Sequence, residues 1–184
     1  MKENNLVITG MGAVTPVGIG VSEYWNALKE GTCGVGKITR FDAGEMPVQI
    51  AAELKDFDPT AYMPKTLART MDPFMQFAFI AAEQAIADSG LCIESESDRV
   101  GIVMGTALHG VGILGRTQAH LDLDGKTAEP KLLTKCMGNV AACQFSILHH
   151  ITGPSMTVST ACSSGGDAVT LASLLLNGGM ADAV

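Results

Sequence analysis

The sequence predicts an α/β fold in which a mainly parallel sheet is covered by helices on both faces. Three observations lead to this prediction. Apolar runs with the length of strands alternate along the chain with longer runs that are typical of helices. The predicted strands are apolar on both faces, as in a parallel sheet covered by helices. The composition, with 47% hydrophobic and only 17% charged residues, is that of a chain that buries a core.

Short apolar runs, rich in β-branched residues and bounded by glycine or polar residues, indicate the strands. NLVITG predicts a buried strand at residues 6–9, and MPVQIAAEL predicts a second strand around residues 48–53. RVGIVMG predicts a continuous apolar strand at residues 100–104. SMTVST predicts another buried strand, and ADAV reads as the beginning of one more.

The clearest helix is predicted between Asp72 and Gly90. Asp72 suits the N-cap, Pro73 suits the first helical position, and Gly90 suits the stop. Glu83 is the only charged residue between residues 74 and 87, so we expect this helix to be buried.

Three further helices follow from start and stop signals. The first has Ser22 as its predicted N-cap and stops at Gly31, and the second spans roughly residues 135–149. The third includes SSGGDAVTLASLLLN and closes at Gly178.

Two glycine-rich stretches are predicted to be loops. GTALHGVGILG follows the strand at residues 100–104. Gly10 and Gly12 predict a tight turn rather than a dinucleotide-binding loop, because Pro16 follows where a helix would have to open toward a pyrophosphate.

Charge and cysteine usage exclude several classes of protein. The net charge of −7 argues against a nucleic-acid surface, which needs clustered lysine and arginine. No apolar run approaches the ~20 residues that span a bilayer, and no signal peptide is expected. The cysteine count is odd and lacks CxxC spacing, so we expect no disulfide framework, no metal site and a cytoplasmic location. The five cysteines are Cys33, Cys92, Cys136, Cys143 and Cys162.

Cys162 lies in STACSSGG, at the predicted joint between a strand and a helix. The nucleophilic form of cysteine is the thiolate, and the unpaired N–H groups and the dipole at a helix start favour that anion. Small neighbours leave room for an acyl group, and backbone N–H groups at a sharp turn can bind an oxyanion. This pattern predicts that Cys162 is a nucleophile; the alternative, that it is a small buried residue, stays open.

The predicted helix over residues 135–149 makes Cys136 and Cys143 core residues, whereas Cys33 and Cys92 have no predicted role.

None of the four histidines stands out as the base for Cys162. His149 and His150 precede the strand that leads to Cys162, so they belong to the opposite end of that strand. His109 is the best candidate, because it follows a parallel strand and therefore lies at the edge where α/β sites gather. The alternative for all four, His120 included, is a surface or helix-capping role.

The chain resembles the β-ketoacyl-acyl carrier protein synthases of the elongating KAS I/II type. The resemblance covers nearly the whole chain, and the STACSSG motif is highly specific. The matching stretches, in the order of the family, are VITGMGAVTPVG, FDAGEMPVQIAAELKDFDP, ARTMDPFMQFAFIAAEQAIADSG, RVGIVMGTALHG, GPSMTVSTACSSGGDAV and NGGMADAV.

The resemblance implies a thiolase-like fold, with residues 1–184 as its N-terminal βα half. It implies that Cys162 accepts an acyl chain from acyl carrier protein as a thioester, and that malonyl-acyl carrier protein then loses carbon dioxide and extends the chain by two carbons. It also implies a homodimer without metal or cofactor. Leu108 falls where an apolar residue of the acyl pocket is expected.

The chain departs from the family pattern in one large respect. In relatives, two histidines, a lysine and a second oxyanion donor lie in the C-terminal half, and none of the four histidines here matches them. We therefore expect this chain alone to be incomplete for turnover. EPKLLTKCMGN also departs from the family, which leaves the acyl length open. The alternatives are a truncated or dimer-partner chain without catalysis, a thiolase, and a polyketide-type ketosynthase.

Overall fold

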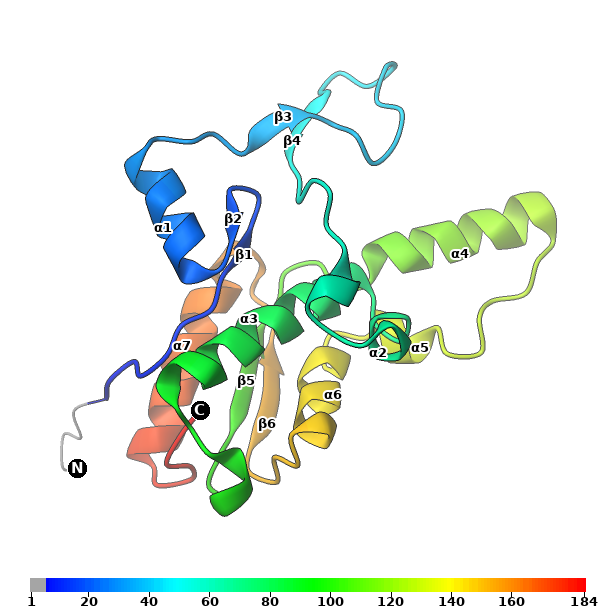
Figure 1. Cartoon of the computed structure of the whole chain (residues 1–184). Coiled ribbons are helices and arrows are strands. Elements are labelled where there is room, and N and C mark those ends of the chain that lie inside the picture. The colour runs from blue at the N-terminus through cyan, green and yellow to red at the C-terminus, as the bar shows by residue number, and fades with distance from the viewer. Residues whose placement is uncertain (1–5) are drawn as a thin grey trace.

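The computed structural model describes residues 6–184, which are built around a short parallel sheet (Figure 1). Strands β5 (Ile102–Gly105) and β6 (Ser155–Val158) pair in parallel over their whole length. At the lower end of β5 in Figure 1, Ala183 forms a single parallel bridge with Val100, where the sequence predicts a strand to begin. The predicted strand at residues 100–104 is confirmed with a shift of one or two residues.

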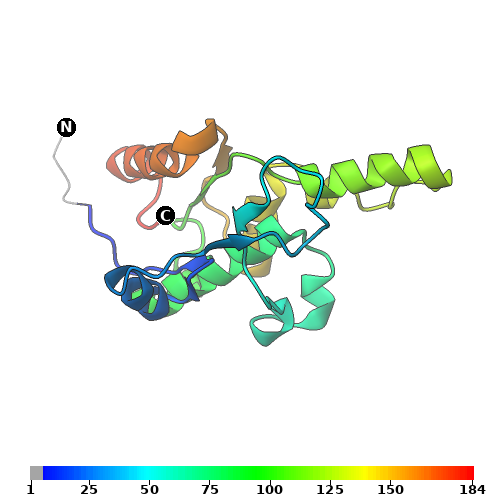
Figure 2. The same cartoon turned by 90° about the horizontal axis from the view of Figure 1, so that it is seen from above.

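Helices cover both faces of this parallel pair. Helix α7 (Ser164–Asn177) packs against one face, and α6 (Val140–Leu148) packs against the other, with α3 (Pro73–Ser89) alongside it. Figure 2 shows this order from above, with α7 on one side of the strands and α3 and α6 on the other. The three layers confirm the predicted α/β class.

The remaining elements lie around these layers, and α4 projects away from the body (Figure 1). They are β1 (Val14–Thr15), β2 (Gly18–Ile19), α1 (Val21–Lys29), β3 (Val35–Lys37), β4 (Ile50–Ala52), η1 (Pro59–Ala61), α2 (Lys65–Ala68), η2 (Ile93–Ser95), α4 (Val111–Asp124), α5 (Leu133–Cys136) and η3 (Ala161–Ser163). None of the helices described over residues 6–184 is both long and apolar enough to cross a membrane.

Helix α3 forms the centre of the core and agrees closely with its prediction. Pro73 is its first residue, Asp72 occupies the N-cap, and Gly90 ends it in the left-handed conformation with φ 67°. Met75 is 1% exposed, and the ring of Phe79 meets that of Phe145 of α6 edge-on at 5.4 Å. The apolar run thus packs α3 against the helix layer that covers the sheet.

Two strand predictions need correction. Residues 6–9 form no strand, because no strand of the described chain pairs with them. The second expected strand is shorter than residues 48–53, and as β4 it pairs antiparallel with β3. The β1–β2 pair is also antiparallel, so parallel pairing within residues 6–184 is confined to β5, β6 and the bridge at Ala183.

Two helix predictions and one loop prediction also differ from the structure. α1 has Gly20 at its N-cap, so Ser22 lies inside the helix. The expected loop after β5 contains the start of α4, since Gly110 takes the left-handed conformation and burial of Ile113 anchors the first turn. The helix expected over residues 135–149 is two helices, because Met137 is extended with ψ 144°. The expected end of α7 at Gly178 is confirmed.

Gly10 and Gly12 allow close packing rather than a turn. Neither has a positive φ, and both lie in an extended segment that runs along α3. A Cβ atom would lie 2.1 Å from the Ala85 carbonyl oxygen at Gly10, and 1.9 Å from that of Ala81 at Gly12. Only glycine therefore lets the N-terminal segment approach α3 this closely.

The Gly12→Ala substitution should lower the free energy of unfolding by about 1–3 kcal/mol, because its methyl group would collide with the α3 backbone. Gly115→Ala is the matched control. Its Cβ would meet nothing within 4 Å, and it lies inside α4, so this change should raise stability by about 0.5–1 kcal/mol. Urea unfolding measures both, and equal effects of the two substitutions would contradict the packing argument.

Candidate active site

The turn from β6 into α7 places Cys162 at the carboxyl edge of the parallel sheet. Cys162 lies in η3, between the end of β6 and the first residue of α7, as the sequence predicts. The preceding residue, Ala161, has φ 53°, a conformation that residues other than glycine seldom adopt. The chain therefore turns sharply just before the thiol.

The thiol itself is open to solvent. Cys162 is exposed, and a Cβ added at Gly165 or Gly166 would meet nothing within 4 Å, so the first turn of α7 is uncovered on that side. The alternative that Cys162 is a buried core residue is therefore wrong. The Cys162 N–H donates to no group of residues 6–184, which leaves a backbone donor free beside the sulfur.

A buried serine fastens this turn to the neighbouring strand. Ser164 is 3% exposed, and its Oγ accepts a hydrogen bond of 2.9 Å from Thr160 N–H. The same hydroxyl lies 2.7 Å from the Ala161 carbonyl oxygen and 3.1 Å from that of Thr106, so its single proton is shared between two acceptors. Gly105, at the end of β5, makes room for this contact, because a Cβ there would lie 2.3 Å from the Ser164 carbonyl oxygen.

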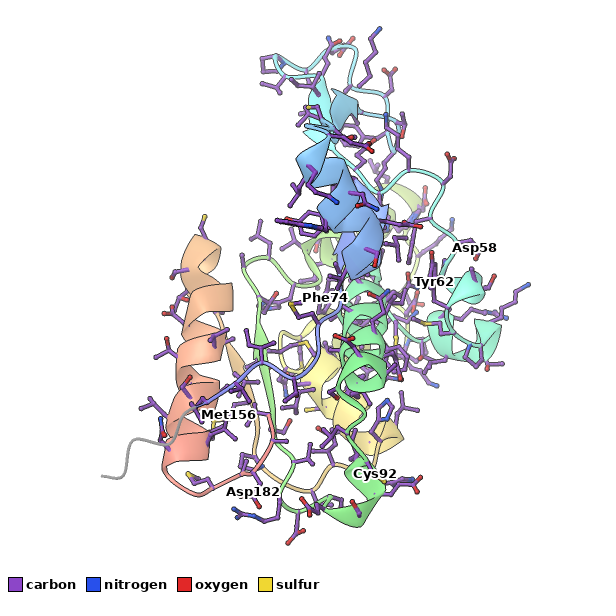
Figure 3. All side chains as sticks on the ribbon, turned by 60° about the vertical axis from the view of Figure 1, so that its left-hand side comes forward. Asp58, Tyr62, Phe74, Cys92, Met156 and Asp182 are labelled. Atoms are coloured by element: carbon purple, nitrogen blue, oxygen red, sulfur yellow. The ribbon has the colours of Figure 1, made fainter. Side chains whose placement is uncertain are left out.

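The other cysteines do not share these surroundings. Cys136 is buried at the end of α5, whereas Cys143 is exposed on α6, so the prediction that both are core residues of one helix is wrong for Cys143. Cys33 and Cys92 are exposed. Figure 3 shows Cys92 beyond the lower end of α3, at the opposite end of the molecule from the start of α7.

The structure brings one histidine to the edge of the sheet where Cys162 lies. His109 follows β5, its ring packs against Gly138, and its buried Nδ1 has no hydrogen-bond partner in the described chain. No histidine ring is hydrogen-bonded to Cys162 within residues 6–184.

The other three histidines have different roles. His149 Nε2 lies 2.7 Å from Glu83 Oε1, and its ring centroid is 4.3 Å from that of Phe145. His150 is the next residue, before β6 begins, and His120 pairs with Asp124 on α4. As the chain direction predicts, His149 and His150 lie at the end of β6 away from Cys162.

Leu108 lies in the segment between β5 and α4, at the same edge as Cys162. Its side chain is 79% exposed, so it lines no closed pocket formed by the described residues. An exposed leucine at this edge is available to contact an apolar group brought to the thiol.

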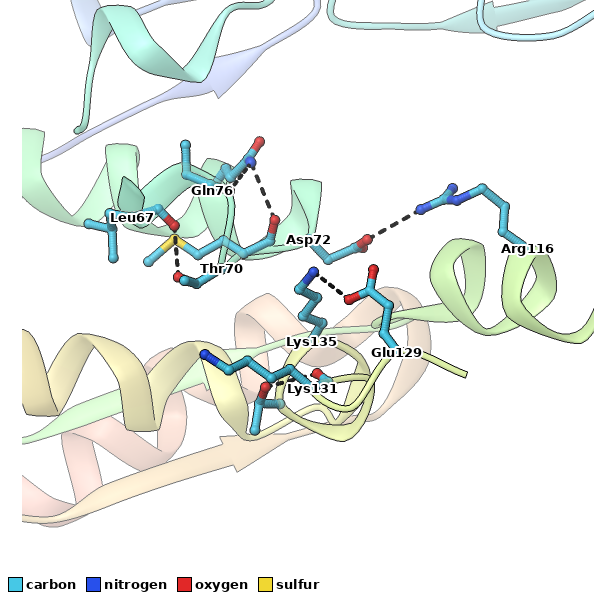
Figure 4. Close-up of polar contacts among 11 residues, drawn as sticks. Leu67, Thr70, Asp72, Gln76, Arg116, Glu129, Lys131 and Lys135 are labelled. Atoms are coloured by element: carbon cyan, nitrogen blue, oxygen red, sulfur yellow. Dashed lines mark hydrogen bonds and ion pairs between the residues drawn. The ribbon is translucent and has the colours of Figure 1, made fainter. Parts of the chain in front are cut away.

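A second polar cluster lies away from Cys162, between the start of α3 and α4 (Figure 4). Asp72 Oδ1 lies 3.6 Å from Arg116 Nη2, and Lys135 Nζ lies 2.7 Å from Glu129 Oε2. These two ion pairs line a hollow of about 380 Å³. Burial raises the pKa of the Asp72 carboxyl, and the charges of Arg116 and Lys135 partly offset the rise. Among residues 6–184 no cluster of three or more metal-ligating side chains occurs.

An apolar hollow also lies apart from the thiol. It has a volume of about 590 Å³ and lies between the N-terminal segment, α3 and the edge of β5 that β6 does not occupy. Its lining includes Val7, Ile86, Val103 and Val184, and it does not include Cys162 or Leu108.

The fold and the turn thus define an α/β chain that presents an exposed thiol at a strand-to-helix elbow. The model of the β-ketoacyl synthase N-terminal domain matches residues 3–184, and the chain belongs to this family.

Curated relatives and solved structures agree with this assignment. The 3-oxoacyl-[acyl-carrier-protein] synthase 2 of Synechocystis sp. is 36% identical over 100% of this chain and 45% of its own length. The enzyme of the same name from Coxiella burnetii is 40% identical over 90% of this chain and 40% of its own length. This chain therefore spans less than half the length of these two relatives.

Solved structures confirm the thiolase-like fold that the resemblance implies. A β-ketoacyl synthase from Burkholderia phymatum has a TM-score of 0.79 and 27% identity, over 95% of this chain and 44% of that one. A type II polyketide ketosynthase, solved in complex with its acyl carrier protein and bound to a hexaketide, has a TM-score of 0.80 and 25% identity, over 95% of this chain and 47% of that one.

Cys162 should react with iodoacetamide faster than the other four cysteines, by about tenfold or more, because its exposed thiol lies beside a free backbone N–H at the uncovered start of α7. Peptide mass spectrometry after brief labelling gives the five rates. Cys143 is the internal control, since it is also exposed but lies on α6. Labelling of Cys162 at or below the rate of Cys143 would contradict the site.

Proposed function

We propose that residues 1–184 form the N-terminal part of a β-ketoacyl synthase that carries its acyl substrate on Cys162. The Cys162 thiolate attacks the thioester carbonyl of an acyl-acyl carrier protein. A new carbon–sulfur bond forms, and the carrier's sulfur leaves and takes up a proton. The observation that carries this proposal is the exposed thiol beside a free backbone N–H at the start of α7.

The second half-reaction lengthens the chain. Malonyl-acyl carrier protein loses carbon dioxide, and the carbanion attacks the carbonyl of the Cys162 thioester. A carbon–carbon bond forms, the Cys162 sulfur leaves, and the product is a β-ketoacyl thioester two carbons longer. The Cys162 N–H donates to the oxyanion that develops in both steps, and such a donor contributes about 2.7–4 kcal/mol in other enzymes.

The groups that assist decarboxylation lie outside this chain in our proposal. The histidines of residues 6–184 are engaged elsewhere or have no hydrogen bond to Cys162. Since the chain spans less than half of its relatives, residues 1–184 alone should not complete the reaction.

Acyl carrier protein is the proposed partner, in keeping with the related ketosynthase that was solved in complex with one. A second copy of the protein is also proposed, because α4 and its surroundings expose apolar side chains that a dimer interface would cover. These side chains are Val111, Leu114, Leu121, Leu123 and Leu133. Leu108 is proposed to contact the acyl chain. The five cysteines are all free, which favours a cytoplasmic location.

A polyketide-type ketosynthase is the second candidate function. Related structures include the hexaketide-bound ketosynthase and the ishigamide ketosynthase/chain length factor, so the fold accommodates both kinds of chain. A partner chain without catalysis is disfavoured by the exposed cysteine at the elbow.

Condensation of an acyl and a malonyl carrier protein by the full-length protein tests the proposal. Cys162→Ala should lower the rate by roughly 10³-fold or more, because the atom that carries the acyl group is removed. Cys143→Ala is the matched control and should keep the rate. Retained condensation in Cys162→Ala would overturn the proposal, and the carbon chain length of the product distinguishes the fatty acid from the polyketide candidate.

A further inference from the structure

Two hydroxyl groups flank Cys162 and point to the same carboxylate oxygen. Thr160, two residues before the thiol, donates its hydroxyl proton to Asp167 Oδ2. Ser163, the residue after the thiol, has its Oγ 3.1 Å from the same Oδ2 and 2.9 Å from the Thr160 carbonyl oxygen, so its single proton is shared between these two acceptors. Asp167 therefore connects the two sides of the turn that presents Cys162.

The helix geometry explains why position 167 can reach back to the turn. Asp167 lies four residues after Ser163, so the two side chains share one face of the helix. It is the acidic residue in the first turn of α7, where a negative charge is favoured by the helix dipole. The position is thus suited to a carboxylate, and the turn supplies its two donors.

Asp167 has no other side-chain hydrogen bond or ion pair within the described part of the chain. It forms no ion pair with a basic side chain of residues 6–184. It also does not cap α7, because no side chain accepts a hydrogen bond from the cap of this helix. The carboxylate engages hydroxyl groups and leaves the backbone N–H of Cys162 free.

We propose that Asp167 is a positioning residue for Cys162. By accepting the hydroxyls of Thr160 and Ser163, it holds Ala161 in its left-handed conformation and fixes the directions of the Cys162 sulfur and N–H. Ser164 holds the same turn from the other side, against the end of β5. The inference rests on the proposed role of Cys162 as nucleophile, and it adds the group that orients it.

The two hydrogen bonds end on one oxygen, which allows a sharp test. The amide of Asp167→Asn retains an oxygen that can occupy the place of Oδ2, whereas Asp167→Ala removes it. If hydrogen bonding positions the thiol, the asparagine variant of the full-length protein should alkylate at Cys162 within about threefold of wild type, and the alanine variant about tenfold or more slowly. Asp122→Ala, on α4, is the matched control and should not change the rate.

Acyl transfer provides a second readout, with kcat calculated per folded enzyme so that a loss of stability does not change it. Asp167→Ala should lower kcat for transfer from acyl-acyl carrier protein about tenfold and leave KM within about twofold, because the substrate contacts are intact. Thr160→Val and Ser163→Ala are further variants that keep the carboxylate. A double variant combines Thr160→Val with Ser163→Ala. Adding Asp167→Ala to this double variant should cause no further loss of kcat, since both hydroxyl donors are already absent.

Two results would overturn the inference. One is an alkylation rate of Asp167→Ala within twofold of wild type. The other is an asparagine variant as slow as the alanine variant, which would assign the effect to charge rather than to hydrogen bonding. If alkylation of Cys162 depends on Asp167 but no acyl group is transferred to Cys162, the proposed function fails and the positioning role stands.

Discussion

The architecture of the site depends on one close backbone approach, between the end of β5 and the first turn of α7. Gly105 permits this approach, and the buried Ser164 hydroxyl joins the turn to the Thr106 carbonyl oxygen. The ends of two parallel strands and the start of a helix consequently meet at one place. Cys162 is carried on that meeting point, so its exposure and its free N–H follow from the backbone rather than from its immediate side-chain neighbours.

Elements with strong local signals could be predicted from the sequence. Pro73 and Gly90 define α3, Gly178 ends α7, and the apolar run before STACSSGG gives β6, because capping and burial act over a few residues. Features that depend on distant contacts were missed. The strand expected at residues 6–9 lacks a pairing partner in the described chain, and α4 forms despite a glycine-rich sequence because Ile113 is buried.

In the candidate site, too, features with a local sequence signal could be predicted, and those that depend on the folded backbone could not. Cys162 could be found from the spacing of strand, small residues and helix, and the direction of β6 correctly separates His149 and His150 from the thiol. The role of Asp167 was missed because the reach of Thr160 across the turn depends on the left-handed Ala161, which no sequence pattern indicates. The four-residue spacing of Ser163 and Asp167 was the one signal available.

The central claim is that the thiol at the start of α7 carries the acyl group. The most direct test incubates the full-length protein with an acyl-acyl carrier protein in the absence of a malonyl donor, and then maps the modified residue by mass spectrometry. The account predicts one acyl group per chain, attached to Cys162 as a thioester that hydroxylamine removes. An acyl group on another residue, or none with Cys162 free, would contradict it.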